Sequence, residues 1–152
     1  MEKLQELSHE LEEAIRRANT VIYRRGRSIL SEMGISNSQF NALLTLQEFG
    51  ALTMGDLCKH LFTACSTATD LADRLERDGL VERIRDVKDR RIVRMHLLPK
   101  GEEVVSAVVT ERQHFLDKLL EEYSSEEHTV LLNAMEVLAE RMERFDRNFP
   151  VL

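Results

Sequence analysis

Six basic side chains between residues 80 and 94 form the strongest candidate binding surface in this 152-residue chain. They are Arg83, Arg85, Lys88, Arg90, Arg91 and Arg94. Three acidic residues share the stretch, so it carries a charge of +3, whereas the whole chain carries −6. Basic charge gathered in one segment of an acidic protein is typical of a surface that contacts phosphates. A charged hairpin that is merely solvated is the alternative interpretation.

A second set of polar side chains precedes this segment, on a helix predicted over residues 65–78. Its apolar residues recur at helical spacing and mark the buried face. The opposite face and its flanks carry Ser66, Thr67, Thr69, Asp70, Asp73, Arg74 and Arg77. Hydroxyl groups donate to or accept from base edges, and a carboxylate accepts from a cytosine amino group. Since a helix fits the major groove of B-DNA, this face is a candidate for reading bases.

The apolar spacing predicts the elements that position these groups. Capping-box residues and glycines indicate helices at residues 3–33, 36–50, 53–61, 65–78, 99–122 and 124–148. Alternation typical of strands occurs only at residues 80–84 and 92–97, on either side of the polar tip 85–91. Two short helices followed by a β-hairpin are typical of a winged helix-turn-helix.

The long terminal helices carry apolar stripes that a compact core does not cover. In the last helix the stripe consists of Leu131, Ala134, Leu138, Met142, Phe145 and Phe149. Exposed stripes of this length rarely stay solvated, so we expect a second copy of the chain to pair with them around a two-fold axis. Packing of the stripes on one another within a single subunit is the alternative.

Two segments resemble the MarR family of bacterial transcriptional regulators: LADRLERDGLVERIRD at 71–86 and DRRIVRMHLLPKG at 89–101. The resemblance spans essentially the whole chain. It implies a single subunit over residues 1–152, mainly α with a small β-wing. A winged helix-turn-helix DNA-binding lobe at 36–98 would be flanked by a helical dimerisation lobe, 1–34 and 99–152. In the family's Asp-x-Arg pattern, Asp89 would orient Arg91, which would contact DNA. Asp70 departs from the family, where a basic residue is common.

The expected function is therefore a homodimeric DNA-binding regulator, a ligand-responsive repressor of an inverted-repeat site in double-stranded DNA. The candidate DNA contacts are Ser66, Thr67, Thr69, Asp70, Arg74, Arg77, Arg85, Lys88, Asp89, Arg90 and Arg91. The resemblance also implies a small anionic or phenolic effector, for which Tyr23, Arg24 and Arg27 are candidates. Packing at the edge of a dimer is the alternative role for these three residues. A helical dimeric scaffold without specific DNA binding is the alternative function.

Other chemistry has little support in the sequence. Cys65 starts the predicted reading helix, where oxidation would disturb DNA binding; an inert packing role is the alternative. The five histidines are scattered and no catalytic motif is present, so we expect no metal, no cofactor and no enzyme activity. No apolar run is long enough to span a membrane, and two cysteines without a disulfide framework suit a reducing cytoplasm.

Overall fold

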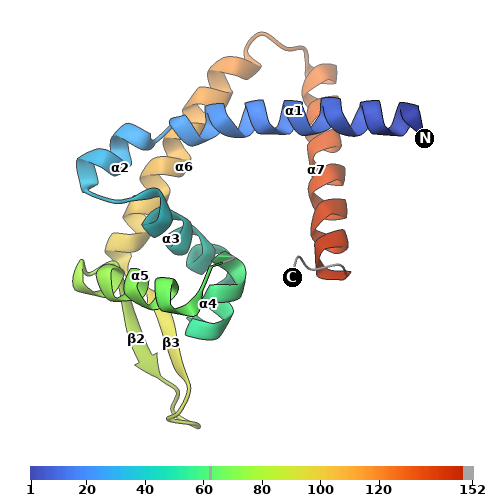
Figure 1. The fold of residues 1–152 in the computed structure, drawn as a ribbon. Coiled ribbons are helices and arrows are strands. Elements are labelled where there is room, and N and C mark those ends of the chain that lie inside the picture. Colours follow the sequence, from blue (N-terminus) through green and yellow to red (C-terminus); the bar gives the residue numbers. More distant parts are fainter. Residues whose placement is uncertain (62, 149–152) are drawn as a thin grey trace. The chain divides into compact units, whose positions relative to one another are not determined.

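The computed structural model describes residues 1–61 and 63–148, and the chain divides into two units, Met1–Arg112 and Gln113–Leu152. The first unit contains α1 (Glu2–Arg24), α2 (Arg27–Met33), α3 (Asn37–Phe49), β1 (Leu52–Thr53), α4 (Met54–Leu61), α5 (Cys65–Arg77), β2 (Val81–Arg85), β3 (Val93–Leu97) and most of α6 (Pro99–Leu120) (Figure 1). The second unit contains the end of α6 and α7 (Ser125–Asn148). The fold class expected from the sequence, mainly α with a small β-wing, is confirmed.

Local capping signals set several of the helix starts. The Ser36 hydroxyl accepts the Gln39 backbone N–H at 3.1 Å, and the Gln39 side-chain oxygen accepts the Ser36 N–H at 2.9 Å, which completes a capping box before α3. At the start of α4, the Thr53 hydroxyl oxygen accepts the Asp56 backbone N–H at 3.1 Å. The helices predicted over 36–50 and 53–61 are confirmed on this basis.

The single helix predicted over residues 3–33 is wrong, because the chain breaks at Arg25–Gly26 between α1 and α2. Arg25 has an extended backbone, and Gly26 has φ +81°, a region that residues with a Cβ rarely adopt. Gly26 is also buried, and a Cβ there would lie 2.7 Å from Cγ1 of Val108. The apolar spacing continues across the break, so periodicity alone does not reveal it.

A three-stranded antiparallel sheet, in the order β1-β3-β2, supports the helix-turn-helix formed by α4 and α5. Met95 of β3 is fully buried and pairs with Leu52 of β1 on one side and Arg83 of β2 on the other. The fully buried core residues around it come from all layers of the lobe: Phe40, Leu43, Leu57, Leu75, Leu80, Val81 and Val108. The turn between α4 and α5 includes Phe62, which lies outside the described residues.

The first turn of α6 rests directly on the backbone that joins α5 to the hairpin. The Leu80 carbonyl accepts the Leu98 N–H at 3.0 Å. Gly101 lies over the same carbonyl, and a Cβ on Gly101 would overlap that oxygen and would lie 2.6 Å from the Leu97 side chain. Only glycine therefore allows this close approach.

In the second unit, the Ser124 hydroxyl accepts the Glu127 N–H at 3.3 Å, and the Glu127 carboxylate accepts the Ser124 N–H at 2.8 Å. This capping box starts α7, as predicted. Most apolar side chains of α7 are exposed in the single chain, among them Leu131, Met135, Met142 and Phe145, whereas Leu138 is half-buried. Phe149, the last expected member of the stripe, lies outside the described residues.

Candidate nucleic-acid interface

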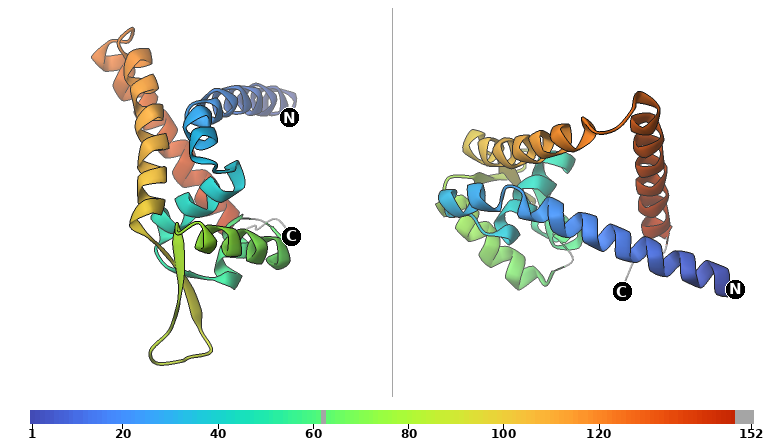
Figure 2. Two further views of the ribbon diagram at one scale, coloured as in Figure 1. Left: turned by 90° about the vertical axis from the view of Figure 1, so that its left-hand side faces the viewer. Right: turned by 90° about the horizontal axis from the view of Figure 1, so that it is seen from above.

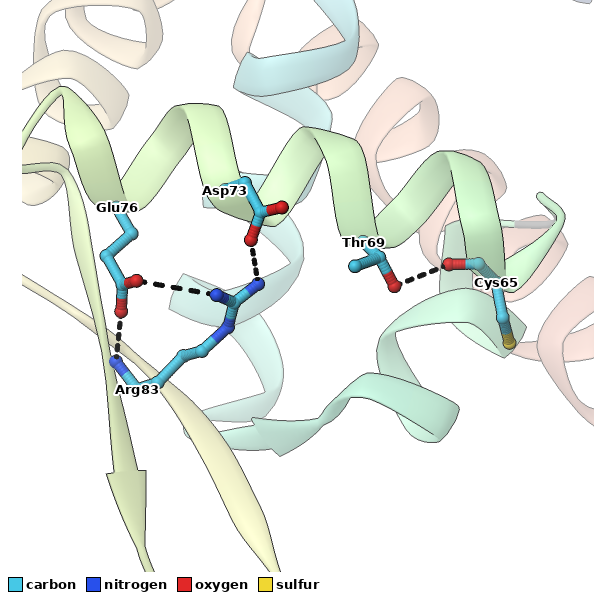
Figure 3. Close-up of polar contacts among 5 residues, drawn as sticks. All are labelled: Cys65, Thr69, Asp73, Glu76 and Arg83. Carbon is cyan, nitrogen blue, oxygen red and sulfur yellow. Dashed lines mark hydrogen bonds and ion pairs between the residues drawn. The ribbon is translucent and has the colours of Figure 1, made fainter.

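Helix α5 separates a buried apolar face from an exposed polar one. Ala68, Ala72 and Leu75 are fully buried in the lobe. The predicted reading residues on this helix are all exposed: Ser66, Thr67, Thr69, Asp70, Arg74 and Arg77. The Thr69 hydroxyl donates to the Cys65 carbonyl at 2.8 Å (Figure 3), so its proton is engaged by the helix backbone and its oxygen can still accept a hydrogen bond. Ala64 precedes the helix and provides no side-chain cap for its first N–H groups.

The hairpin β2–β3 projects from the lobe beyond its helices (Figure 2). Its tip is closed by the Asp86 carboxylate, which accepts the backbone N–H groups of Lys88 at 2.7 Å and Asp89 at 3.1 Å. These two hydrogen bonds hold the pKa of Asp86 below its usual value. The Arg85 guanidinium donates to the Arg90 carbonyl at 3.1 Å and closes the other side of the tip. The tip is therefore an ordered loop whose shape depends on an ionised aspartate.

Asp89 holds the guanidinium of Arg91 at the edge of the same tip. One Asp89 oxygen accepts the Arg91 Nε–H at 3.1 Å, and the other accepts an Nη2–H at 3.0 Å. The Arg91 guanidinium lowers the pKa of Asp89, as expected for a paired carboxylate. The Arg91 side chain is nevertheless 90% exposed. This geometry agrees with the orienting role that the resemblance implies for Asp89.

A brace between the hairpin and α5 is formed by Arg83, one of the six basic residues of the segment 80–94. The Arg83 guanidinium donates to Asp73 at 2.6 Å and to Glu76 at 3.4 Å (Figure 3). The Arg83 backbone N–H also donates to the Glu76 carboxylate, at 3.1 Å. The Arg83 side chain is only 27% exposed, so this cation is committed to the protein. The brace fixes β2 against α5.

The three predicted effector residues line one hollow of about 350 Å³ in the first unit. Tyr23, Arg24 and Arg27 share it with Asn19, Thr20 and Asn37. The Tyr23 hydroxyl donates to the Asn41 side chain at 3.3 Å. The hollow therefore combines an aromatic ring, two guanidinium groups and neutral polar groups.

Arg112 of α6 contacts Tyr23, one of the residues that line this hollow, and sequence reasoning did not identify it. Its guanidinium carbon lies 5.6 Å from the centroid of the Tyr23 ring and 5.2 Å from that of Phe40. Its Nε is buried and has no hydrogen-bond partner among the described residues. The cation stacks on both aromatic rings and so orients Tyr23.

The two cysteines lie on either side of the helix-turn-helix turn, and both are reduced. Cys65 is exposed at the first position of α5, whereas Cys58 of α4 is buried. The pKa of Cys58 is raised, mainly by burial and to a smaller extent by the neighbouring Cys65 thiol.

Among residues 1–61 and 63–148, no group of three or more His, Cys, Asp or Glu is placed to hold a metal ion. No helix of that part of the chain is long and apolar enough to cross a membrane.

Comparison with known proteins places this architecture among regulators. The MarR family model matches residues 35–93. The chain is 39% identical over 135 residues to the uncharacterized HTH-type transcriptional regulator YsmB of Bacillus subtilis (strain 168), covering 89% of this chain and 92% of the relative. It is 30% identical to the transcriptional repressor MprA of Escherichia coli (strain K12), covering 82% and 72%. The structure of a MarR family protein from Bacillus stearothermophilus matches with a TM-score of 0.82 and 41% identity, covering 91% and 97%.

Proposed function

This chain belongs to the MarR family of transcriptional regulators, and from that membership we propose that it is a homodimeric repressor of an inverted-repeat DNA site. One observation carries the proposal. A closed hairpin tip presents Lys88, Arg90 and Arg91 to solvent, and Arg83 fixes that hairpin beside the exposed polar face of α5. A reading helix next to a cationic hairpin suits adjacent major and minor grooves. Repression is favoured because one relative, MprA, is a repressor.

In this proposal, α5 lies in the major groove with its first turns toward the base edges. Ser66, Thr67, Thr69 and Asp70 are the proposed base-reading groups, and Arg74 and Arg77 reach flanking phosphates. An aspartate repels phosphates but accepts from a cytosine amino group. We therefore expect Asp70 to contribute selectivity rather than affinity, and Asp70→Ala to relax the preference for cytosine at one position.

The hairpin tip enters the neighbouring minor groove, where the negative potential attracts arginine. Arg91 is the proposed principal contact, oriented by Asp89, and Lys88 and Arg90 flank it. Arg85 supports the tip through the Arg90 carbonyl.

The test is fluorescence anisotropy with a duplex selected from a random pool by the wild-type protein. Arg91→Ala is expected to weaken binding by about tenfold. The matched control is Arg17→Ala, which removes the same charge from the exposed surface of α1 and is expected to change affinity little. Failure to select any duplex, together with no DNA recovered by a genome-wide pull-down, would favour the scaffold function instead.

Homodimerisation is proposed from the exposed apolar faces of the terminal helices. On α1 these are Leu4, Leu7, Leu11 and Ile15; on α7 they include Leu131, Met135 and Met142. Monomeric soluble proteins rarely expose apolar stripes of this length, and larger exposed apolar patches mark interaction sites. Sedimentation analysis is expected to give a dimer, and Leu7→Glu together with Met135→Glu to give monomers that no longer bind the selected duplex. Monomeric wild-type protein would contradict this part of the proposal.

Effector control is proposed at the hollow lined by Tyr23, Arg24 and Arg27. Two guanidinium groups beside an aromatic ring suit a small anionic or phenolic ligand. Benzoate and phenol are suitable probes, and calorimetric titration measures their binding. Arg27→Ala is expected to abolish benzoate binding and leave DNA binding intact, since Arg27 lies on α2 and not on α5 or the hairpin. Benzoate binding of equal strength in the variant would contradict the assignment.

Thiol control is a second candidate, favoured by the exposure of Cys65 at the start of α5. Oxidation of that thiol by hydrogen peroxide adds polar bulk to the proposed reading surface. Peroxide is then expected to weaken DNA binding of the wild-type protein and not of Cys65→Ser. Full DNA affinity in protein whose Cys65 is measurably oxidised would exclude this control.

A further inference from the structure

The most exposed large apolar side chain of the described residues, apart from the terminal Met1, lies at the hairpin tip. Val87 is 95% exposed. An isolated surface valine usually requires no explanation. Val87 differs from such an isolated residue because hydrogen bonds close the loop around it and because its neighbours are cations.

Hydrogen bonds on both sides of Val87 hold the loop that exposes it. The preceding Asp86 carboxylate accepts the N–H groups of the two residues that follow Val87. The Asp86 N–H in turn donates to the Ile92 carbonyl at 2.9 Å, which closes the loop at its base. Little entropy remains to be lost when such a loop meets a partner.

The side chains beside Val87 define the kind of surface that it fits. Lys88, Arg90 and Arg91 are exposed on the same tip, so the partner is anionic. A valine among these cations fits a groove with negatively charged walls whose floor carries no projecting hydrogen-bond donor. The minor groove of A·T-rich DNA fits this description, because phosphates line it and its floor presents only the acceptors adenine N3 and thymine O2. At a G·C pair, the guanine 2-amino group projects from the floor and would be buried against the valine without an acceptor.

We propose that Val87 packs on the floor of the minor groove and selects against guanine at the base pairs beneath the hairpin tip. This inference rests on the proposed function, since it requires the tip to enter DNA. It adds a specificity determinant that carries no charge and forms no hydrogen bond. In this proposal the cations attract the hairpin tip to the DNA, and the valine discriminates between A·T and G·C pairs.

Three duplexes of alternating sequence separate this effect from every other groove contact. Inosine·cytosine pairs have the major-groove edge of G·C and the minor-groove edge of A·T, because inosine lacks only the 2-amino group. The full-length protein is titrated by anisotropy with 24-base-pair d(I-C), d(G-C) and d(A-T) duplexes at low salt. We expect d(I-C) and d(A-T) to bind about fivefold more tightly than d(G-C), the effect of partly burying one valine side chain.

The Val87→Ser variant is expected to abolish this preference by losing affinity for d(I-C) and d(A-T) while keeping its affinity for d(G-C). Val87→Ala should give an intermediate ratio. Ile84→Ser, which removes an exposed apolar side chain from β2 away from the tip, is the matched control and should keep the wild-type ratio. A preference that persists in Val87→Ser would assign selection to the arginines and overturn the inference. Equal wild-type affinity for all three duplexes would also overturn it, whereas binding to no DNA would overturn the proposed function itself.

Discussion

Replacing Arg83 with alanine and replacing Arg91 with alanine each remove one positive charge from the same hairpin, yet we expect opposite signatures. The Arg83 side chain is 27% exposed and contacts Asp73 and Glu76. The Arg91 side chain is 90% exposed and pairs with the Asp89 carboxylate, which is itself 38% exposed. Arg83 therefore stabilises the lobe, and Arg91 is available to phosphates.

The expected magnitudes follow from these environments. Loss of the Arg83 brace costs about 1 kcal/mol of folding free energy, which lowers Tm by about 2 to 4 °C. Loss of the exposed Arg91 pair changes folding free energy by less than about 0.5 kcal/mol. On the DNA side, each phosphate contact contributes about 0.9 to the slope of log affinity against log salt concentration. Arg91→Ala should reduce the slope by about 0.9 for each wing that contacts DNA, and Arg83→Ala should leave the slope unchanged.

Calorimetric melting measures the change in Tm. Anisotropy titrations on the selected duplex between about 50 and 300 mM KCl measure the salt slope, and this range resolves a change of about 0.9 per phosphate contact. Arg83→Ala is still expected to weaken binding, by about tenfold, because the hairpin loses its anchor on α5. A lysine at this position reaches only one carboxylate at a time, so the DNA affinity of Arg83→Lys should lie between that of Arg83→Ala and that of the wild type. An equal fall in salt slope for both alanine variants would refute the assignment of Arg83 to the protein rather than to DNA.

Three further predictions concern the backbone, the tip and the thiols. Gly26→Ala is expected to cost about 2 to 4 kcal/mol in denaturant unfolding, because φ is +81° and the new Cβ would crowd a valine of α6; Gly34→Ala, with φ +69° and open space, should cost only about 1 kcal/mol, and equal losses would contradict the steric argument. Because the folded-state pKa of Asp86 is lowered, its contribution to tip stability is present at neutral pH and is lost as pH falls through that lowered value; an NMR titration midpoint at or above 3.8 would contradict this. Ellman's reagent at pH 8, about half a unit below an ordinary thiol pKa, should modify Cys65 rapidly and Cys58 only on denaturation or at higher pH, and two fast thiols would disprove the burial argument.

Signals that are local in the sequence predicted the fold well. The capping box of Ser36 and Gln39 and the one of Ser124 and Glu127 both form as their three-residue spacing indicates. Strand alternation on each side of a polar tip predicted the hairpin. In each case the residues that decide the structure are neighbours along the chain, so composition and spacing contain the information.

Features that depend on distant residues were not predictable in this way. Strand β1 has two residues, too few for a periodicity, and it exists because Leu52 pairs with Met95. The bracing role of Arg83 depends on the approach of β2 to α5, and that of Arg112 depends on the rings of two other helices. Charge counting located the basic segment but did not distinguish a cation that holds the protein together from cations that face solvent.

The close contact between Gly101 and the Leu80 carbonyl has a mechanical consequence. Most helices meet their neighbours through layers of side chains, which change rotamer and absorb small displacements. Here Gly101 meets the Leu80 carbonyl with no side chain in between, the Leu98 N–H donates to the same carbonyl, and the Lys100 ammonium donates to the Asp78 carbonyl at 2.9 Å. A shift of that turn is therefore transmitted directly to the junction of α5 and the hairpin, because no flexible side chain lies between Gly101 and the Leu80 carbonyl to absorb it.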